Sequence, residues 1–260
     1  MSRCLFIIWI GLGGTLFLAA PAPLPAAEPA GAARYERLFA DARQTWAAEP
    51  TNSVKGWQFA RACYDRAEFA TNSAQKIGLA RQGLAAARAS IALQPKVAAA
   101  HFYLAMNLGQ LADATRTLGG LKLVSEMERE FKAAHDLDAA FDYAGPDRSL
   151  GLLYRDAPGW PISVGSRAKA RKHLERACEL SKAYPDNQLT LLEAWLKWGE
   201  RKKLLSELKS VADLLAEARL KLTGEEWACA WADWDQRWRE IQAKAAAEPL
   251  HPPSSPKGGR

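Results

Sequence analysis

The sequence has few of the residues that build metal and redox sites. It contains four cysteines and four histidines in 260 residues, and no two of them stand at ligand spacing. No CxxC pair and no G-x-S-x-G, H-E-x-x-H or Walker motif is present. We therefore predict no metal site, no cofactor and no catalytic residue of a recognised type.

Long runs of one charge are also missing. The net charge is +6, but Lys and Arg alternate with acids along the chain, and no basic arm interleaved with aromatic residues occurs. Proteins that bind nucleic acid usually concentrate their positive charge on one patch or arm. We therefore expect no nucleic-acid partner.

Only one long apolar run occurs, and it lies at the N-terminus. Arg3 precedes about 17 apolar residues, and a stretch rich in Ala and Pro follows. This layout predicts a secretory signal peptide at residues 1–27, cleaved near Ala26 or Ala27, and a linker at 28–33. The protein would then be exported, periplasmic or secreted, with no membrane span after cleavage. The alternative is an uncleaved anchor, because the run is nearly long enough to span a bilayer.

Three cysteines remain after such a cleavage: Cys63, Cys178 and Cys229. An odd number allows at most one disulfide. Because each has small or apolar neighbours at helical spacing, we predict buried thiols rather than a bridge.

Runs of β-branched residues are absent, whereas Ala, Leu, Arg, Lys and Glu dominate. This composition predicts an all-α protein over residues 34–246. Asn52 and Asn72 lie in segments that open helices, and Thr223 with Glu226 forms a capping-box pattern. Residues 247–260 are polar and rich in proline, so we expect a disordered tail.

A pattern of large, small and large residues recurs along the chain. The three triplets are Phe59-Ala60-Cys63, Leu104-Ala105-Leu108 and Leu150-Gly151-Tyr154. Two following segments carry related sets: Phe131-Ala134-Leu137 and Leu174-Ala177-Leu180. The small residue lets two helices approach closely, while the large ones fill the space between helix pairs.

These triplets resemble the tetratricopeptide repeat (TPR), with Pro95 at the position of the closing proline. The resemblance implies an α-solenoid of about four helical hairpins. The spacing between small residues is 45 residues from Ala60 to Ala105 and 46 from Ala105 to Gly151, against 34 in the family. Each unit therefore has longer helices or an inserted loop.

The last helical segment carries a stripe of tryptophans: Trp227, Trp231, Trp234 and Trp238. Spacings of four, three and four residues place them on one helical face. Such a stripe suits binding to sugar or a membrane, but a solenoid also needs a helix to cover its open end. We predict a capping helix packed on the preceding one, with the polar residues between the rings in solvent.

The TPR resemblance also implies which residues line the concave face. The expected binding residues are Trp57, Arg61, Tyr64, Phe102, Tyr103, Met106, Arg148, Leu152 and Arg155, with Trp160 on an adjoining loop. Rings supply apolar area and Arg pairs with carboxylates. This mixture favours a protein or peptide partner, or a small anionic or amphipathic ligand; an ordinary groove with solvated arginines is the alternative.

A second resemblance rests on the segments GPDRSLGLLY and APGWPISVG and the helix KARKHLERA. They are similar to the T components associated with TRAP transporters. The matching positions are Gly145, Pro146, Arg148, Gly151, Tyr154, Pro158, Gly159 and Gly165. This resemblance implies a periplasmic helper of a substrate-binding protein, assembled as a homo-oligomer.

The leading hypothesis is thus a non-enzymatic binding or scaffold module. The alternative is an exported enzyme, of glycoside-acting or lyase type, with Asp147 and Asp156 as acids. Nine residues place these two acids on one helical face but about 13 Å apart, which is too far for paired carboxylates.

Overall fold

The computed structural model describes residues 31–115 and 120–247, and this part of the chain is all α-helical. The predicted fold class is therefore confirmed. Ten helices are present in the described residues: α1 Ala32–Ala48, α2 Ser53–Ala67, α3 Ser73–Leu93, α4 Ala98–Thr115, α5 Gly120–Leu137, α6 Phe141–Asp156, α7 Arg167–Leu180, α8 Pro185–Lys197, α9 Arg201–Lys221 and α10 Glu225–Ala246.

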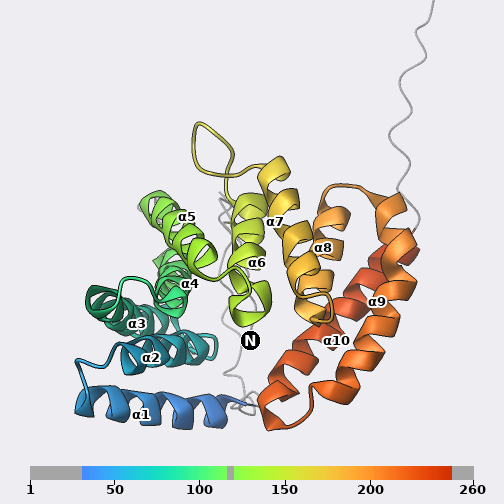
Figure 1. The fold of residues 1–260 in the computed structure, drawn as a ribbon. Coiled ribbons are helices and arrows are strands. Elements are labelled where there is room, and N and C mark those ends of the chain that lie inside the picture. Colours follow the sequence, from blue (N-terminus) through green and yellow to red (C-terminus); the bar gives the residue numbers. More distant parts are fainter. Residues whose placement is uncertain (1–30, 116–119, 248–260) are drawn as a thin grey trace, which may run out of the picture.

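Consecutive helices pack as four hairpins, α2–α3, α4–α5, α6–α7 and α8–α9, with α1 against α2 and α10 against α8. The chain runs round an arch from α1 to α10 (Figure 1). The backbones of the first helices approach one another closely in the order α2, α4, α6 and α8, whereas α3, α5, α7 and α9 meet one another only through long side chains such as Arg88 and Glu126. The first helices therefore lie on the inside of the curve, which we call the inner face.

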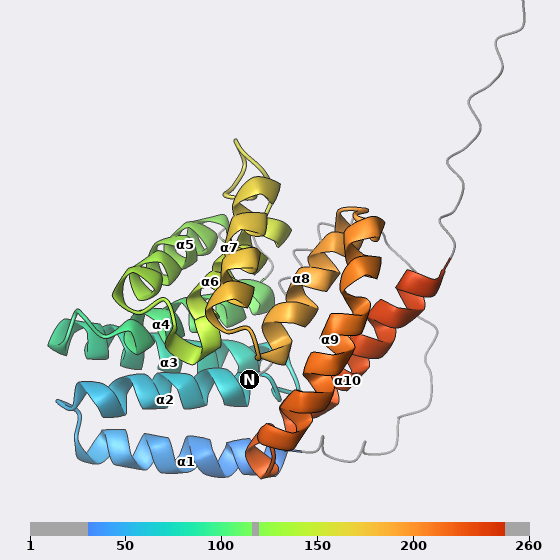
Figure 2. The same ribbon diagram turned by 45° about the vertical axis from the view of Figure 1, so that its right-hand side comes forward.

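The two ends of the arch come together (Figure 2). Arg37 of α1 lies 3.7 Å from Glu225 of α10, and a Cβ added to Gly31 would meet Sγ of Cys229. The Arg37–Glu225 pair is largely exposed, and such pairs contribute little stability. The contact marks where the arch closes rather than what holds it closed.

Asparagine caps open two of the helices as predicted. The Asn52 side chain accepts hydrogen bonds from the backbone N–H of Val54 and Lys55, and Asn72 accepts one from Gln75. The predicted capping box at Thr223 is wrong, because Gly224 is the N-cap of α10 and no side chain caps it. With φ of 98°, this residue has a backbone conformation that glycine adopts without strain.

Helix α6 begins with a left-handed turn. Asp142, Tyr143 and Ala144 have φ between 50° and 62°, and helical geometry resumes at Gly145. Pro146 therefore lies in the first turn of the regular helix, as expected, where a missing N–H costs little. The turn aims the Asp142 and Tyr143 side chains along the inner face, as described below.

The small residues of the three triplets are at helix contacts. Ala60 and Ala105 are fully buried, and a Cβ added to Gly151 would lie 2.4 Å from Leu174. The second helices fit less well, because Leu137 and Leu180 are exposed. The buried apolar residues form two clusters, one from Phe39 to Ala170 and one from Leu174 to Ala245. The division falls within α7.

The tryptophans of α10 pack inside the molecule. Trp234 is 1% exposed, and its ring contacts those of Tyr184, Trp227 and Trp231. The prediction that the polar residues between them face solvent is wrong for Arg237, which is 7% exposed. Because α10 packs mainly on α8, Arg237 reaches the acids of that helix.

Several predictions fall wholly or partly outside the described residues. They are the signal peptide at 1–27, the linker at 28–33 up to residue 30, and nearly all of the tail at 247–260. Among the helices that the structure describes, none has the length and apolar character needed to cross a membrane. Cys63 and Cys178 are buried, and burial raises the pKa of each thiol to about 12. Neither they nor Cys229 forms a disulfide.

Candidate functional site: the inner face of the arch

Aromatic rings and charged groups alternate along the inner face. Trp57 of α2 stacks on Tyr103 of α4, with ring centroids 6.1 Å apart. The Arg61 guanidinium lies over the Tyr103 ring, 5.9 Å from its centre. Arg61 also lies 3.5 Å from the Asp65 carboxylate. The Arg61 side chain is 43% exposed. Three predicted residues are therefore together here: solvent reaches Arg61 and part of Trp57, whereas Tyr103 is buried beneath them, with 4% of its surface exposed.

A second ring pair lies further along the same face. Tyr143, in the left-handed turn of α6, stacks on Tyr184 with centroids 4.3 Å apart. The Arg148 guanidinium lies 5.3 Å from the Tyr184 ring centre. Arg148 also donates a hydrogen bond of 2.8 Å to Asn187, and Asn187 donates to the Tyr143 carbonyl. The turn of α6 is thereby tied to the start of α8.

Arginines and carboxylates form a connected network from α6 across α8 to α10. Arg148 lies 3.6 Å from Asp142 and 3.2 Å from Asp186. Arg237 pairs with Asp186, Asp233 and Glu193 and donates to Thr190. Burial opposes ionisation of Asp186, yet Arg237 and Arg148 keep its pKa below the usual value. Asp186 is therefore ionised inside the arch.

The charge of Asp142 also affects residues on α2 and α4. Burial raises the pKa of Tyr103, and the Asp142 charge raises it further. The pKa of Arg61 is raised by Tyr103 and by the two acids Asp65 and Asp142, against the effect of burial. Burial also raises the pKa of Asp65 despite its contact with Arg61. One continuous set of interacting groups thus runs from α2 to α10.

The predicted arginines are not available as simple carboxylate receptors. Arg155 lies 2.8 Å from Asp156 and 3.9 Å from Glu193, and Arg61 and Arg148 have acids of this chain beside them as well. A ligand carboxylate would have to compete with these groups. The prediction that the arginines favour an anionic ligand is therefore weakened.

Other predicted residues lie in the core. Phe102 is 1% exposed and contacts the rings of Phe131 and Phe141. Tyr64, Met106 and Leu152 are each less than 9% exposed. The TPR pattern predicted these residues on the inner face, but in this chain neighbouring helices bury them. Trp160 is 88% exposed on the loop that projects from the arch between α6 and α7 (Figure 1).

Sequence reasoning missed Asp65, Asp142, Tyr184, Asp186 and Arg237. No large-small-large triplet was assigned to the fourth hairpin, so its first helix contributed no expected inner residue. The available signal was Pro185 followed by Asp186, which is typical of a helix start. Pro185 indeed begins α8.

The two acids of the enzyme alternative face different neighbours. Asp147 is fully buried, and its carboxylate oxygens lie 3.0 Å from Nδ1 of His135 on α5 and 2.7 Å from Nδ1 of His173 on α7. Asp156 pairs with Arg155 and with Lys197 on α8. The expected shared face is wrong, and the two acids do not converge.

The His135–Asp147–His173 cluster also corrects the expectation that the histidines are isolated. Helices α5 and α7 bring the two rings to 6.1 Å. Within residues 31–115 and 120–247, no group of three or more His, Cys, Asp or Glu residues is arranged to hold a metal ion. The cluster holds α5, α6 and α7 together.

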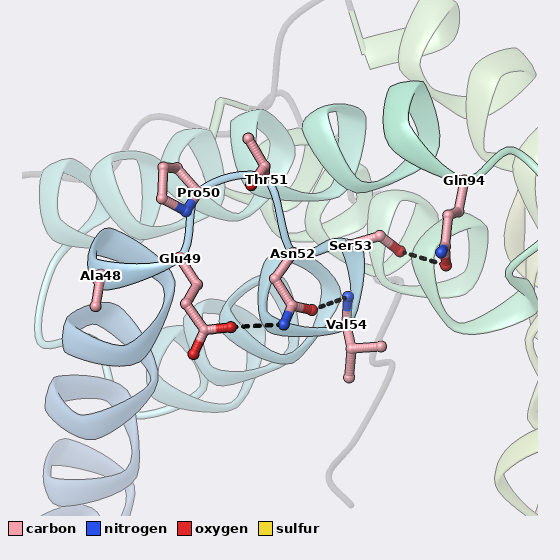
Figure 3. A pocket seen from close by; sticks show the side chains of 8 residues that line it. All are labelled: Ala48, Glu49, Pro50, Thr51, Asn52, Ser53, Val54 and Gln94. Carbon is pink, nitrogen blue, oxygen red and sulfur yellow. Dashed lines mark hydrogen bonds between the residues drawn. The ribbon is translucent and has the colours of Figure 1, made fainter.

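Besides a hollow of about 670 Å³ lined by Arg171 and residues 199–203, two hollows are present in the described residues, and Tyr143 and Tyr184 of the inner face line the larger one. One, of about 530 Å³, is at the turn between α1 and α2 (Figure 3). There Asn52 donates to Glu49 and Ser53 donates to Gln94, so the polar groups serve the turn and the helix cap. The other, of about 1090 Å³, lies between the α7–α8 turn and α9. Its lysines and acids are equal in number, which gives it no clear preference of charge.

Comparison with known proteins agrees with this architecture. A family model described as "Regulator of microtubule dynamics protein 1-3" matches residues 32–142, which is less than half of the chain. No curated protein gives a significant match. The crystal structure of TTC0263, a thermophilic TPR protein of Thermus thermophilus, is similar with a TM-score of 0.60 and 17% identity, over 81% of this chain and 92% of that one. The chain is therefore a TPR-like helical protein.

Proposed function

We propose that this protein is a non-enzymatic binding module that holds a protein or peptide segment along its inner face. The observation that carries the proposal is the continuous strip of rings and ion pairs from Trp57 to Arg237. Trp57, Arg61 and Tyr143 are the members that solvent reaches, and they lie over a buried layer formed by Tyr103, Tyr184, Arg148 and Arg237. The exposed members offer aromatic rings and a guanidinium group, which suit a peptide segment with mixed side chains.

The geometry also favours binding over catalysis. The inner-face carboxylates are paired with arginines, and Asp147 is enclosed by two histidines. A general acid needs hydrogen-bond reach to a substrate, and neither Asp147 nor Asp156 shares a pocket with the other. The matched family model covers residues 32–142 alone. We therefore propose no microtubule-related function for this chain.

Peptide display tests this proposal without a known partner. Peptides selected on the full chain are synthesised and titrated by calorimetry against Trp57→Ala and Arg61→Ala. We expect each variant to bind about tenfold more weakly, as for anchors at an interface centre. Arg81→Ala, an exposed arginine of α3 on the outer side, is the matched control and should bind as the parent does.

If both inner-face variants bind as tightly as Arg81→Ala, the proposal is wrong. Hydrolysis that is lost in Asp147→Asn would instead support the enzyme alternative. Native mass spectrometry of the purified protein adds a direct readout, since a retained small molecule would favour the small-ligand form of the proposal. The same spectra report whether the chain forms homo-oligomers.

Export and assistance to a transport system remain part of the proposal. They rest on the N-terminal apolar run and on the resemblance of the α6–α7 segment to T components. We expect the mature protein to start after Ala26 or Ala27, which N-terminal sequencing of the protein from an envelope fraction would establish. A chain that retains Met1 in that fraction would show an uncleaved anchor.

A further inference from the structure

The loop between α6 and α7, residues 157–166, exposes two large apolar side chains. Trp160 is 88% exposed and Ile162 is 64% exposed. The loop projects beyond the ends of the neighbouring helices in both views (Figures 1 and 2). Trp160 and Ile162 together give this tip exposed apolar surface on one short turn, and contiguous exposed apolar surface marks interaction sites.

The loop is held by its own backbone. Gly165 N–H donates to the Pro158 carbonyl at 2.9 Å, Ile162 N–H to Gly159 at 3.0 Å, and Ser166 N–H to Tyr154 of α6 at 2.8 Å. Val164 packs against the first apolar cluster. Because these contacts fix the base and the turn, Trp160 and Ile162 are presented together and need little ordering on binding.

Positive charge surrounds the base of this loop. Segments 155–172 and 197–203 contain nine basic residues and two acidic ones, Asp156 and Glu200. The basic residues are Arg155, Arg167, Lys169, Arg171, Lys172, Lys197, Arg201, Lys202 and Lys203. Glu128, Glu175 and Glu193 from other segments also lie within 4.0 Å of Lys169, Arg171 and Arg155. Nine basic residues against these five acids leave an excess of four positive charges. We call these two segments, with the loop, the basic end.

Ion pairs show that the two segments form one surface. Lys197 of α8 lies 2.8 Å from Asp156 at the end of α6. Arg167 and Arg171 of α7 both donate to Glu200, and Lys203 of α9 lies 3.6 Å from it. Three cations thus share one carboxylate. Hydrogen bonds from Arg171 and Arg167 lower the pKa of Glu200 to about 2, as expected where positive charge is in excess.

We propose that the basic end binds the surface of an anionic lipid bilayer, with Trp160 and Ile162 entering the headgroup layer. Lysines and arginines attract anionic headgroups, while tryptophan prefers the boundary between headgroups and acyl chains. An acidic protein would also complement the positive charge, but it would leave Trp160 and Ile162 at the tip without an apolar partner. Only Arg155 belongs to both surfaces, through Glu193, which also pairs with Arg237. The loop and the cluster at Glu200 lie apart from the inner face, so the proposal does not depend on the proposed function.

Flotation with vesicles tests the proposal. The full chain is mixed with vesicles of phosphatidylcholine alone or of phosphatidylcholine with phosphatidylglycerol, so that the N-terminal apolar run contributes equally in every variant. We expect binding that requires phosphatidylglycerol and falls with added salt. Both Trp160→Ala/Ile162→Ser and Lys172→Glu/Lys202→Glu should reduce the partition coefficient about tenfold or more.

The matched control is Lys96→Glu/Lys182→Glu, which makes the same change of charge at exposed positions away from the basic end. Lys182 follows α7 at the end opposite the loop. The control should bind vesicles as the parent does, and circular dichroism should show equal helix content for all variants. Equal binding to both vesicle types, or an equal loss in the control, would overturn the proposal. Tight binding to polyglutamate without binding to vesicles would overturn it in favour of an acidic protein.

Discussion

Single small residues decide how closely the helices of this protein approach. At Gly151, an added Cβ would lie 2.4 Å from Cδ2 of Leu174 and 3.2 Å from its backbone nitrogen. The side chain could shift, but the backbone of α7 could not do so without moving the hairpin. The small position of the third triplet is thus a steric requirement, and glycine at residue 151 meets it.

We predict that Gly151→Ala destabilises the protein by about 1–3 kcal/mol, because it overpacks the α6–α7 contact. Gly78→Ala is the matched control, since nothing lies within 4 Å of a Cβ at this position in α3. The control should be neutral or stabilise by up to about 1 kcal/mol through helix propensity. Urea unfolding measures both, and equal effects would contradict the steric explanation.

At the scale of helices, the ends of α7 and α9 are joined through Glu200. This residue immediately precedes α9 and receives hydrogen bonds from Arg167 and Arg171. Sequence reasoning identified the helical segment of α7 but had no way to choose this partner, because the arginines lie about 30 residues away. Local patterns define an element, whereas contacts between elements need the packed structure.

We predict a loss of stability on acidification that depends on Glu200. Its pKa is lowered from 4.5 to about 2 in the folded state, so its contribution is complete above pH 4.5 and disappears as the pH falls toward 2. Glu200→Gln should remove this part of the pH dependence, by no more than about 1 kcal/mol because the pair is near the surface.

Thermal melts between pH 5 and 2 measure this effect. Glu207→Gln, an exposed residue of α9, should leave the pH profile unchanged. A Glu200→Gln profile that runs parallel to the parent would show that another carboxylate is responsible.

At the scale of the whole molecule, ion pairs join its two halves on the inner side. The apolar core divides within α7, and Arg148 with Arg237 links α6, α8 and α10 across that division. Positive charge gathers instead at the basic end. The distribution of charge therefore separates a paired inner face from an outer end with excess positive charge.

We predict that Arg237→Ala destabilises the protein by about 3–5 kcal/mol, because it leaves Asp186, Asp233 and Glu193 without their shared cation. Lys209→Ala removes an exposed pair with Asp213 and should cost less than about 0.5 kcal/mol. Guanidinium unfolding distinguishes the two. A small effect of Arg237→Ala would mean that the remaining cations, Arg148 beside Asp186 and Arg155 beside Glu193, compensate these acids.

The sequence by itself determined the all-α fold class, the asparagine caps at two helix starts and the small residues at the hairpin contacts. These features depend on residues close together in the sequence, such as the Asn52 side chain that caps the N–H of Val54, or Ala60 beside Phe59 in one triplet. Periodicity and capping rules are therefore enough to predict them. The tertiary structure alone decided which charges meet. Arg237 lies 51 residues from Asp186, and His173 lies 26 from Asp147. Pairs this distant depend on how the hairpins curve and on where α10 crosses α8, and no local pattern encodes either.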